Sequence, residues 1–463
     1  MRIGIIGGGF SGCMLAVQLL RRAQPEMEIV LAERTGQVGR GVAYSAQNPH
    51  HLLNVRVANM SAFDNDPSHF LRWLWATEPS HPMDDPSAIP PSGHAFVSRG
   101  VYGAYIGDVF ADAVAAAQGR ASLTAIPHEV VRLDPGPAGV SLEMADGSTT
   151  RVDKVVLCVG NFPPALPRGL PDSLAEDPCF IGNPWDPVGF ASIRADDDVL
   201  IIGASLTMVD FAILLDEAGH RGRITALSRR GLLPRRHEQA RRYPLFLDPA
   251  NLPTRIATLV RLVRREVRRA ASHGYDWRSV IDALRPITQR LWQNLPSEER
   301  LRFTRHVQPW WDVHRHRLAP AIAARVDGLF DAGRFAVEAG RIEQLVPQDD
   351  GRLAVTFRRR GGEERQTILV DRVVNCSGPE TDYAHIKDAL VRDLLDRGLA
   401  RPDLCGLGLD VGEDFALRNA VEASVGRLVA LGPPTRAAFW EIIAVPDIRR
   451  QAEALAHQLL VEP

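Results

Sequence analysis

A glycine-rich turn lies at the start of the chain, between a strand-like run and an apolar helical run. Residues 2–6 are β-rich, Gly7, Gly9 and Gly12 follow in a G-x-G-x-x-G pattern, and the helical run ends near Leu20. The first glycine permits a tight turn, the second lets the backbone approach a pyrophosphate, and the third lets the helix pack closely on the strand. The N–H groups and positive dipole end of the helix favour phosphates. The turn therefore predicts a dinucleotide-binding unit, with a plain glycine turn in an α/β fold as the alternative.

An acidic residue supports the first interpretation. Glu33 follows a second apolar run, residues 28–32, and comes 21 residues after Gly12. A carboxylate in this place accepts hydrogen bonds from a ribose diol and repels a 2′-phosphate. The first unit is therefore predicted to bind an adenine dinucleotide with an unmodified ribose.

The same arrangement occurs a second time, in a less regular form. Residues 198–202 predict a strand, 203–208 a turn, 209–215 a helix and 222–228 the next strand. Ser205 and Met208 stand where the pattern has glycine, and the second strand ends in Ser228, Arg229 and Arg230. Guanidinium groups bind phosphate oxygens bidentately, so NADPH is favoured over NADH. The alternative is a solvated arginine pair on a unit that has lost its ligand. The candidate cofactor contacts here are Gly203, Ser205, Leu206, Thr207, Ser228, Arg229 and Arg230.

Length and composition limit the remaining choices. A chain of 463 residues is too long for one ordinary core, so two or three domains are expected. The net charge of −2 gives no general attraction to nucleic acid or to acidic membranes. The five cysteines include no C-x-x-C pair, so neither a dithiol active site nor a metal centre is predicted. No apolar run is long enough for a membrane helix, and the first strand leaves no room for a signal peptide, so a cytoplasmic protein is expected.

The predicted fold is α/β with two Rossmann-type dinucleotide-binding domains and a helical insert. Its local predictions include a helix that starts with Asp66 as cap, a loop over residues 77–94, a helix capped by Ser297, and a closing helix over residues 446–460. The predicted domains are residues 1–195, residues 196–335 with a helical insert at about 251–332, and residues 336–463, which return to the first domain.

Seven further segments carry a resemblance to a known family. They are residues 39–45, 51–56, 60–63, 228–234, 311–317, 374–379 and 440–446. Together with the two glycine turns, they make nearly the whole chain resemble the flavoproteins with two dinucleotide-binding domains, and within these the bacterial FAD/NAD(P)-binding proteins. The chain is more distantly similar to N-hydroxylating and Baeyer–Villiger-type flavin monooxygenases. The resemblance implies FAD in the first unit and NADPH in the inserted second unit.

The resemblance also implies positions for the flavin site. Arg40 and Asn54 are expected near the flavin and are the candidate catalytic residues, although the chain gives no catalytic acid or base. The final helix is expected to point its N-terminus at the flavin. Gly432 is followed by Pro433 where such proteins often have aspartate, so that contact must be absent or replaced. The candidate FAD contacts are Gly7, Gly9, Phe10, Ser11, Gly12, Glu33, Arg34, Arg40, Asn54, Val131, Cys158, Gly160, Gly378 and Gly432.

Three functions are compatible with this cofactor pair. The first is an NADPH-dependent flavin monooxygenase that uses molecular oxygen on a small polar substrate, such as an amine or a carbonyl compound. The second is an NADPH-dependent flavin reductase or dehydrogenase, and the third is a non-catalytic FAD-binding sensor. No nucleic-acid or membrane partner is expected, and a homo-oligomer is left open.

The string from Trp310 to Arg317 is the most unusual sequence outside the glycine turns. It predicts either a helix whose aromatic side chains pack inward while its basic residues are solvated, or a cationic lip over the active site. His314 and His316 are too close in sequence to serve as two ligands on one helix face, so no metal is predicted there. His50 and His51 are expected at the flavin pocket or the surface, and the arginines of 261–269 on a solvated helix face.

Overall fold

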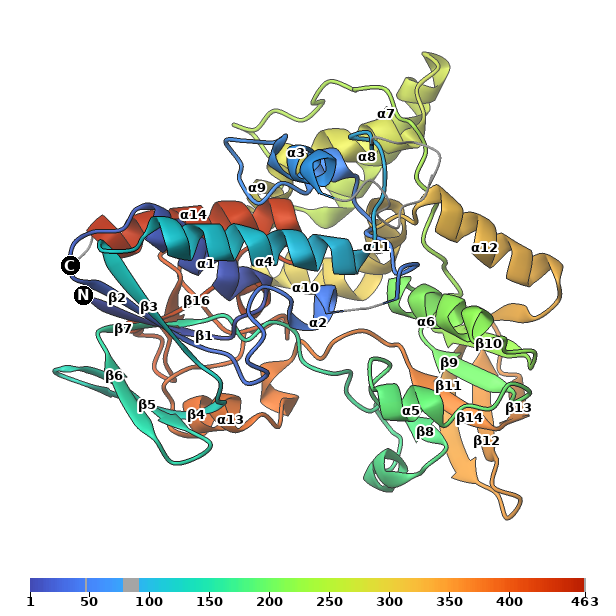
Figure 1. Cartoon of the computed structure of the whole chain (residues 1–463). Coiled ribbons are helices and arrows are strands. Elements are labelled where there is room, and N and C mark those ends of the chain that lie inside the picture. Colours follow the sequence, from blue (N-terminus) through green and yellow to red (C-terminus); the bar gives the residue numbers. More distant parts are fainter. Residues whose placement is uncertain (46–47, 78–90, 462–463) are drawn as a thin grey trace.

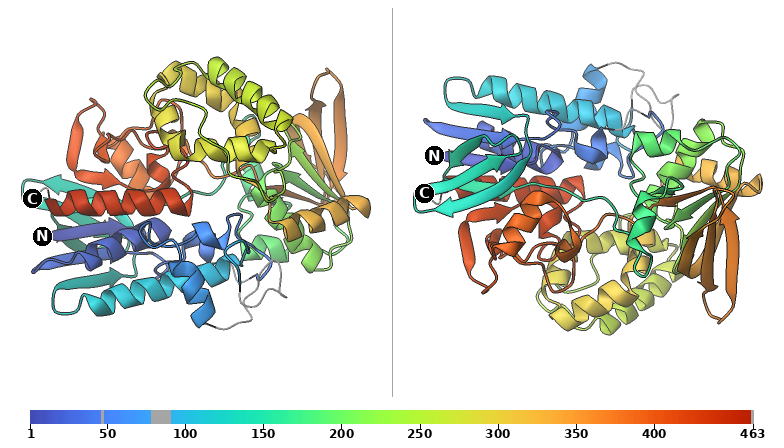
Figure 2. Two further views of the ribbon diagram at one scale, coloured as in Figure 1. Left: turned by 90° about the horizontal axis from the view of Figure 1, so that it is seen from above. Right: turned by 90° about the horizontal axis from the view of Figure 1, so that it is seen from below.

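The computed structural model describes residues 1–45, 48–77 and 91–461. Its described strands form a six-stranded sheet, a seven-stranded sheet and a small three-stranded sheet. Figures 1 and 2 show the two large sheets at opposite ends of the molecule, with a group of helices to one side between them. The predicted α/β fold with two dinucleotide-binding domains is confirmed.

The first large sheet has the strand order β15-β16-β7-β1-β2-β3. Five of its strands are parallel, and β15 runs antiparallel to β16 at one edge. The strands are β1 (Arg2–Ile6), β2 (Met27–Ala32), β3 (Ala121–Ile126), β7 (Lys154–Leu157), β15 (Ala416–Arg418) and β16 (Ser424–Ala430). Because β1 lies between β2 and β7, its carboxyl end is a topological switch point, where open α/β sheets bind ligands.

Both faces of the first sheet are covered (Figure 1). One face packs against the helices α1 (Phe10–Arg21), α4 (Arg99–Ala116) and α14 (Val445–Val461). The other face packs against the antiparallel sheet of β4 (Val130–Gly136), β5 (Gly139–Met144) and β6 (Thr149–Val152), and against α13 (Ala389–Asp396). This burial explains the nearly continuous apolar runs of β1 and β7.

The second large sheet has the strand order β13-β12-β11-β10-β9-β14-β8. Its strands are β8 (Phe180–Ile181), β9 (Val199–Ile202), β10 (Ile224–Ser228), β11 (Phe335–Pro347), β12 (Leu353–Arg359), β13 (Arg365–Val370) and β14 (Arg372–Asn375). The core on one of its faces holds α6 (Leu206–Glu217), α12 (Pro320–Asp331) and part of the short α5 (Pro187–Ala191). The predicted division placed residues 1–195 and 336–463 with the first sheet, whereas the pairing of β8 and of β11–β14 puts these strands in the second.

The helical insert joins β10 to α12 and is made of α7 (Ile256–Ser272), α8 (Trp277–Leu284), α9 (Thr288–Gln293), α10 (Ser297–His306) and α11 (Gln308–Arg315). These helices share an apolar core with Ala437 and Trp440, which precede α14. The Trp292 indole donates a hydrogen bond to the Ala437 carbonyl oxygen at 2.7 Å. The insert is thereby fixed to the C-terminal part of the first sheet's domain. The predicted insert included α12, which packs against the second sheet instead.

The remaining elements are short. They are the helices α2 (Gly41–Tyr44) and α3 (His69–Ala76), and 3-10 turns at Val57–Asn59, Asp172–Glu176, Arg285–Ile287, Tyr383–His385 and Pro433–Thr435. Within the described ranges, no helix combines the length and the apolar character that crossing a membrane requires.

Two predicted helix caps are wrong, and a third helix starts earlier than predicted. α3 begins at His69, and the Asp66 carboxylate pairs with Arg72 at 2.5 Å instead of capping the helix. Ser297 is the first residue of α10 and makes no capping hydrogen bond, because Pro296 occupies the cap position. α6 begins at Leu206, three residues before the prediction. Most of the predicted loop at 77–94 lies outside the described residues.

Candidate functional site

The glycine turn at the end of β1 is built around two close backbone contacts. Gly7 has φ +98°, and a Cβ at this residue would overlap the carbonyl oxygen of Cys158. A Cβ at Gly12 would overlap the carbonyl oxygen of Gly7. Gly7 and Gly12 therefore let β1, α1 and the end of β7 meet at the switch point, in the roles predicted from the sequence.

Gly9 differs, because its α-carbon faces open space. A Cβ at Gly9 would lie 3.7 Å from the α-carbon of Gly41, and no other described atom would come within 4 Å. Gly9 is also the N-cap of α1, and its carbonyl oxygen accepts the N–H of Cys13 at 2.9 Å. The N–H groups of Phe10 and Ser11 lie in the first turn, where a helix supplies no internal acceptors. This cradle, which no side chain of the described residues fills, fits the pyrophosphate of FAD.

Glu33 lies directly beside this cradle. Its Oε2 accepts the N–H of Gly8 at 2.7 Å, and its Oε1 accepts the N–H and the hydroxyl of Thr35 at 3.0 and 2.8 Å. These bonds hold the partly exposed carboxylate at the end of β2, in the position expected for a ribose contact. Arg34 is exposed and pairs with Glu129 at 3.5 Å.

A β-bulge distinguishes Val131 from its neighbours. The pairing of β4 with β5 shifts register between Val130 and Arg132, so Val131 has no partner in that ladder. A bulge leaves the backbone groups of the extra residue outside the ladder. Val131 thus has a local reason to present its backbone to an adenine ring, as the resemblance implied.

The other predicted FAD contacts are spread around the same sheet edge. Arg40 is exposed and adjoins Gly41, the residue closest to Gly9. Gly432 has φ +78°, and a Cβ there would overlap the Ser11 hydroxyl, so the end of β16 meets the first turn of α1. Asn54 is partly buried, and its carbonyl oxygen accepts a hydrogen bond from His237 Nε2 at 3.0 Å.

The second glycine turn repeats the contact seen in the first. Gly203 has φ +109°, and a Cβ there would overlap the carbonyl oxygen of Cys376. Ser205 is exposed at the N-cap of α6, and its side chain makes no capping bond. Leu206 and Thr207 form the first turn of α6. The second unit thus retains an open helix N-terminus despite the serine.

Arginines gather where β10 ends, at the predicted site of a 2′-phosphate. The pKa of Arg230 is lowered by burial, by Arg360 and by Arg229, which shows that these three guanidiniums are close together. No carboxylate among the described residues forms an ion pair with any of them. Arg360 follows β12, far away in sequence, and was therefore missed by the sequence analysis. The Ser228 hydroxyl accepts the N–H of Gly231 at 3.0 Å and shapes the turn after β10.

The two crossings between the large sheets run side by side. Phe162, just after Gly160, forms a β-bridge with Glu380, just after Gly378. Gly160 and Gly378 both have positive φ, and a Cβ at either would meet open space. Backbone conformation therefore explains these two glycines.

A second candidate site lies between α11 and the chain just before α14. Arg315 pairs with Glu441 at 3.1 Å, and their side chains are 11% and 5% exposed. Trp311 donates its indole N–H to the same carboxylate at 2.8 Å. Glu441 has φ +65°, which is strained for a residue with a side chain, and such strain clusters at functional positions.

More charged side chains, buried or partly buried, surround this pair. Burial raises the pKa of Asp312 to about 6, with Arg436 opposing the rise and Glu441 adding to it. Burial also raises the pKa of Asp447 and lowers that of Arg436. Because β1 and β16 are parallel, α1 and α14 both begin at the same sheet edge. We call Asp312, Arg315, Arg436, Glu441 and Asp447 the charged cluster; it lies at the edge that also carries Gly9.

The predicted alternatives for the string from Trp310 to Arg317 can now be compared with its contacts. Its basic residues are not solvated, because Arg315 is bound to Glu441 and Arg317 is 3% exposed and paired with Asp282 at 2.9 Å. Burial, followed by the neighbouring arginines, lowers the pKa of His316 to about 3. Trp310 is 44% exposed. The expectation of solvated basic residues is therefore wrong.

The two adjacent histidines His50 and His51 differ in exposure, since His50 is exposed and His51 is buried. His50 lies 3.6 Å from Glu217, and His51 is buried beside Trp185. Across the described part of the chain, no group of three or more His, Cys, Asp or Glu side chains could hold a metal ion.

Comparison with known proteins agrees with this geometry. Residues 4–162 match the model of the FAD-NAD(P)-binding family. The predicted resemblance to FAD/NAD(P)-binding proteins is confirmed. Among curated protein sequences, none matches the chain significantly.

Solved structures show the same fold at low sequence identity. Ornithine hydroxylase from Pseudomonas aeruginosa is 17% identical, with a TM-score of 0.64 over 99% of this chain and 98% of that one. A cadaverine monooxygenase from Erwinia amylovora, bound to FAD, is 10% identical, with a TM-score of 0.66 over 100% and 94%. L-lysine 6-monooxygenase from Pseudomonas syringae is 15% identical, with a TM-score of 0.64 over 99% of each chain.

Proposed function

We propose that the protein is an FAD-dependent oxidoreductase that uses NADPH, and that it is a flavin monooxygenase acting on a small polar substrate, an amine in the first instance. The charged cluster carries this proposal. Burying several ionised groups is costly, and such groups with shifted pKa values gather at functional sites. The structural neighbours named above are amine hydroxylases and monooxygenases, which makes this substrate class the first to test.

The chain's own residues would hold the cofactors and the substrate. Gly9 and the first turn of α1 would bind the FAD pyrophosphate, and Glu33 its ribose. Arg229, Arg230 and Arg360 would bind the 2′-phosphate of NADPH. Bound FAD supplies reversible electron transfer and, once reduced, the activation of molecular oxygen.

The charged cluster would orient a polar substrate and manage its protons. Carboxylates such as Glu441 and Asp447 suit an amine, while Arg436 suits an anionic group elsewhere on the same molecule. Asp312, with its pKa raised to about 6, can accept a proton near neutral pH.

The test uses purified, FAD-loaded protein. Mixing with NADPH without oxygen should bleach the flavin absorbance, and oxygen consumption should then rise with at least one member of a panel of diamines and basic amino acids. Glu441→Gln should abolish the substrate-dependent oxygen consumption but leave the bleaching intact. Glu413→Gln, an exposed control in the same C-terminal segment, should leave both unchanged.

Two other results would overturn the proposal. Bleaching without any substrate-dependent oxygen consumption, across the amines and a set of ketones, would favour the reductase or dehydrogenase. An absence of bleaching would favour the sensor, in which case the exposed Ser205 and the missing Gly-Asp pair would reflect a lost activity. Arg230→Ala with Arg360→Ala should reduce the preference for NADPH over NADH, since both guanidiniums would face the 2′-phosphate.

A further inference from the structure

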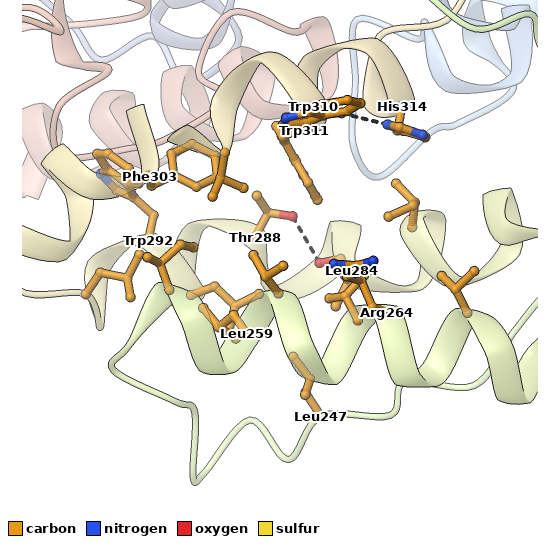
Figure 3. Close-up of a pocket in the computed structure, with 18 of the residues that line it drawn as sticks. Leu247, Leu259, Arg264, Leu284, Thr288, Trp292, Phe303, Trp310, Trp311 and His314 are labelled. Carbon is orange, nitrogen blue, oxygen red and sulfur yellow. Dashed lines mark hydrogen bonds between the residues drawn. The ribbon is translucent and has the colours of Figure 1, made fainter. Parts of the chain in front are cut away.

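The helical insert encloses a large cavity of about 940 Å³. This volume falls within the range of small-molecule sites, roughly 300–1,000 Å³. Its walls come from α7, α8, α9, α10 and α11, with Trp440 from the segment before α14. Figure 3 shows side chains from α7 on one side and from α10 and α11 on the other, pointing into a common space.

Most of the wall is apolar, and its deepest part is buried. Five of the chain's eight tryptophans line the cavity, together with Phe303 and many aliphatic side chains. Leu259, Leu284 and Trp292 are 7%, 2% and 3% exposed. A protein surface could cover only the mouth of such a space, whereas a flexible chain could fill its depth.

One face of α7 changes character along its length. Ile256, Leu259, Val260 and Val263 line the cavity, and the next cavity-lining positions include Arg264 and Arg268. These residues follow the spacing of a single helix face. The arginines of 261–269 were predicted to lie on a solvated helix face. Arg264 and Arg268 are exposed, as predicted, and they also border the cavity.

The mouth of the cavity is positively charged. Arg264 and Arg268 are exposed, and neither is paired with a carboxylate of the described residues. His306 and His314 also line the cavity, and no described aspartate or glutamate does. In Figure 3, Arg264, Trp310 and His314 lie toward one end, while Trp292 and Phe303 lie toward the other.

We propose that this cavity binds a long-chain monocarboxylate. Its hydrocarbon chain would lie against Leu259, Trp292 and Phe303, and its carboxylate would bind Arg264 and Arg268. Burying each CH₂ group gives about 0.8 kcal/mol, and the arginines supply charge-assisted hydrogen bonds at the mouth. This site is separate from both glycine turns and does not depend on the proposed oxidoreductase activity.

The experiment titrates the FAD-loaded full chain with dodecanoate, without NADPH, below the micelle concentration. Binding is followed by calorimetry and by tryptophan fluorescence, since five tryptophans line the cavity. Dodecylammonium and dodecanol serve as ligands with the same chain and different heads. We expect saturable 1:1 binding of dodecanoate, at least tenfold tighter than dodecylammonium.

Variants separate the head and the tail of the ligand. Arg264→Glu with Arg268→Glu should weaken dodecanoate binding at least tenfold. The double variant should also bind dodecylammonium more tightly than dodecanoate, which is the reverse of the order expected for the wild type. Arg261→Glu with Arg265→Glu is the matched control, because these exposed arginines lie on α7 but do not line the cavity. Val260→Phe, which fills part of the apolar end, should weaken all three ligands.

Several results would overturn the inference. They are an absence of saturable dodecanoate binding, equal weakening by both arginine pairs, or a dimer in sedimentation that is broken by Trp310→Ala and competes with dodecanoate. The last result would make a second copy of the chain the occupant. NADPH oxidation is not part of the readout, so failure of this inference and failure of the proposed function are distinguishable.

Discussion

The α-carbon of Gly7 faces the carbonyl oxygen of Cys158 so closely that no side chain fits between them. Gly203 and Cys376 repeat this relationship in the second sheet. In both units the glycine ends the first strand, and the cysteine follows the parallel strand that pairs with it. Both cysteines are small and buried, and each directly precedes a point where the chain crosses between the two large sheets.

This contact predicts that Gly7→Ala and Gly203→Ala destabilise the fold. Each substitution adds a Cβ at positive φ and forces it against backbone, so we expect a loss of about 2–4 kcal/mol in the free energy of unfolding. Urea unfolding of the FAD-free proteins measures it. Gly351→Ala is the control, because Gly351 has φ +80° with open space around it and should lose only about 1–2 kcal/mol. Equal losses at all three positions would show that the close approach is unimportant.

Gly9→Ala should separate cofactor binding from folding. Gly9 has φ −64°, and an added methyl would make only ordinary contact with Gly41, so the apo-protein should unfold at an unchanged urea concentration. The methyl would stand where a pyrophosphate must approach, and FAD affinity should fall by about tenfold or more. FAD titration measures the loss. Gly107→Ala, in α4 with open space around it, should leave FAD affinity unchanged, and equal FAD affinity in both variants would contradict the proposed cradle.

Local patterns were predictable from the sequence because each part of a glycine turn comes from adjacent residues. Gly7, Gly9, Gly12 and Glu33 lie close together because one β-α-β unit fixes their distance. The placement of Gly203 follows by the same reasoning. The fold class was therefore accessible before any long-range contact was known.

Features built from distant segments were not predictable. Arg360 reaches Arg230 only because β11 and β12 extend the second sheet beyond β10. Glu441 meets Arg315 across 126 residues, and the bulge at Val131 depends on pairing with β5. The cap predictions at Asp66 and Ser297 failed because the backbone just before each helix sets the residue at which the helix starts. This backbone contains a proline in both cases.

His237 predicts an acid-dependent loss of stability. Burial lowers its pKa from 6.5 to about 4, and its Nε2–H donates to the carbonyl oxygen of Asn54. Between these pH values the unfolded chain binds more protons, so stability is present above pH 6.5 and falls as the pH drops toward 4. His237→Gln keeps a donor without the titration. Relative to this variant, the wild type should lose about 1–3 kcal/mol between pH 7 and pH 4 in urea unfolding, and parallel curves for the two proteins would exclude a titrating His237.

Asp312 predicts the opposite slope. Burial raises its pKa from 3.8 to about 6, so the folded state holds a proton that the unfolded chain releases between these values. The contribution of Asp312 to stability therefore decreases as the pH rises from about 4 to 6 and is constant above that. Its side chain is 30% exposed, which reduces the expected effect to about 1–2 kcal/mol. Urea unfolding of wild type and Asp312→Asn at pH 4, 5, 6 and 7 measures it. The Asn variant should gain stability relative to wild type across this range, whereas a constant difference would mean that folding does not raise the pKa of Asp312.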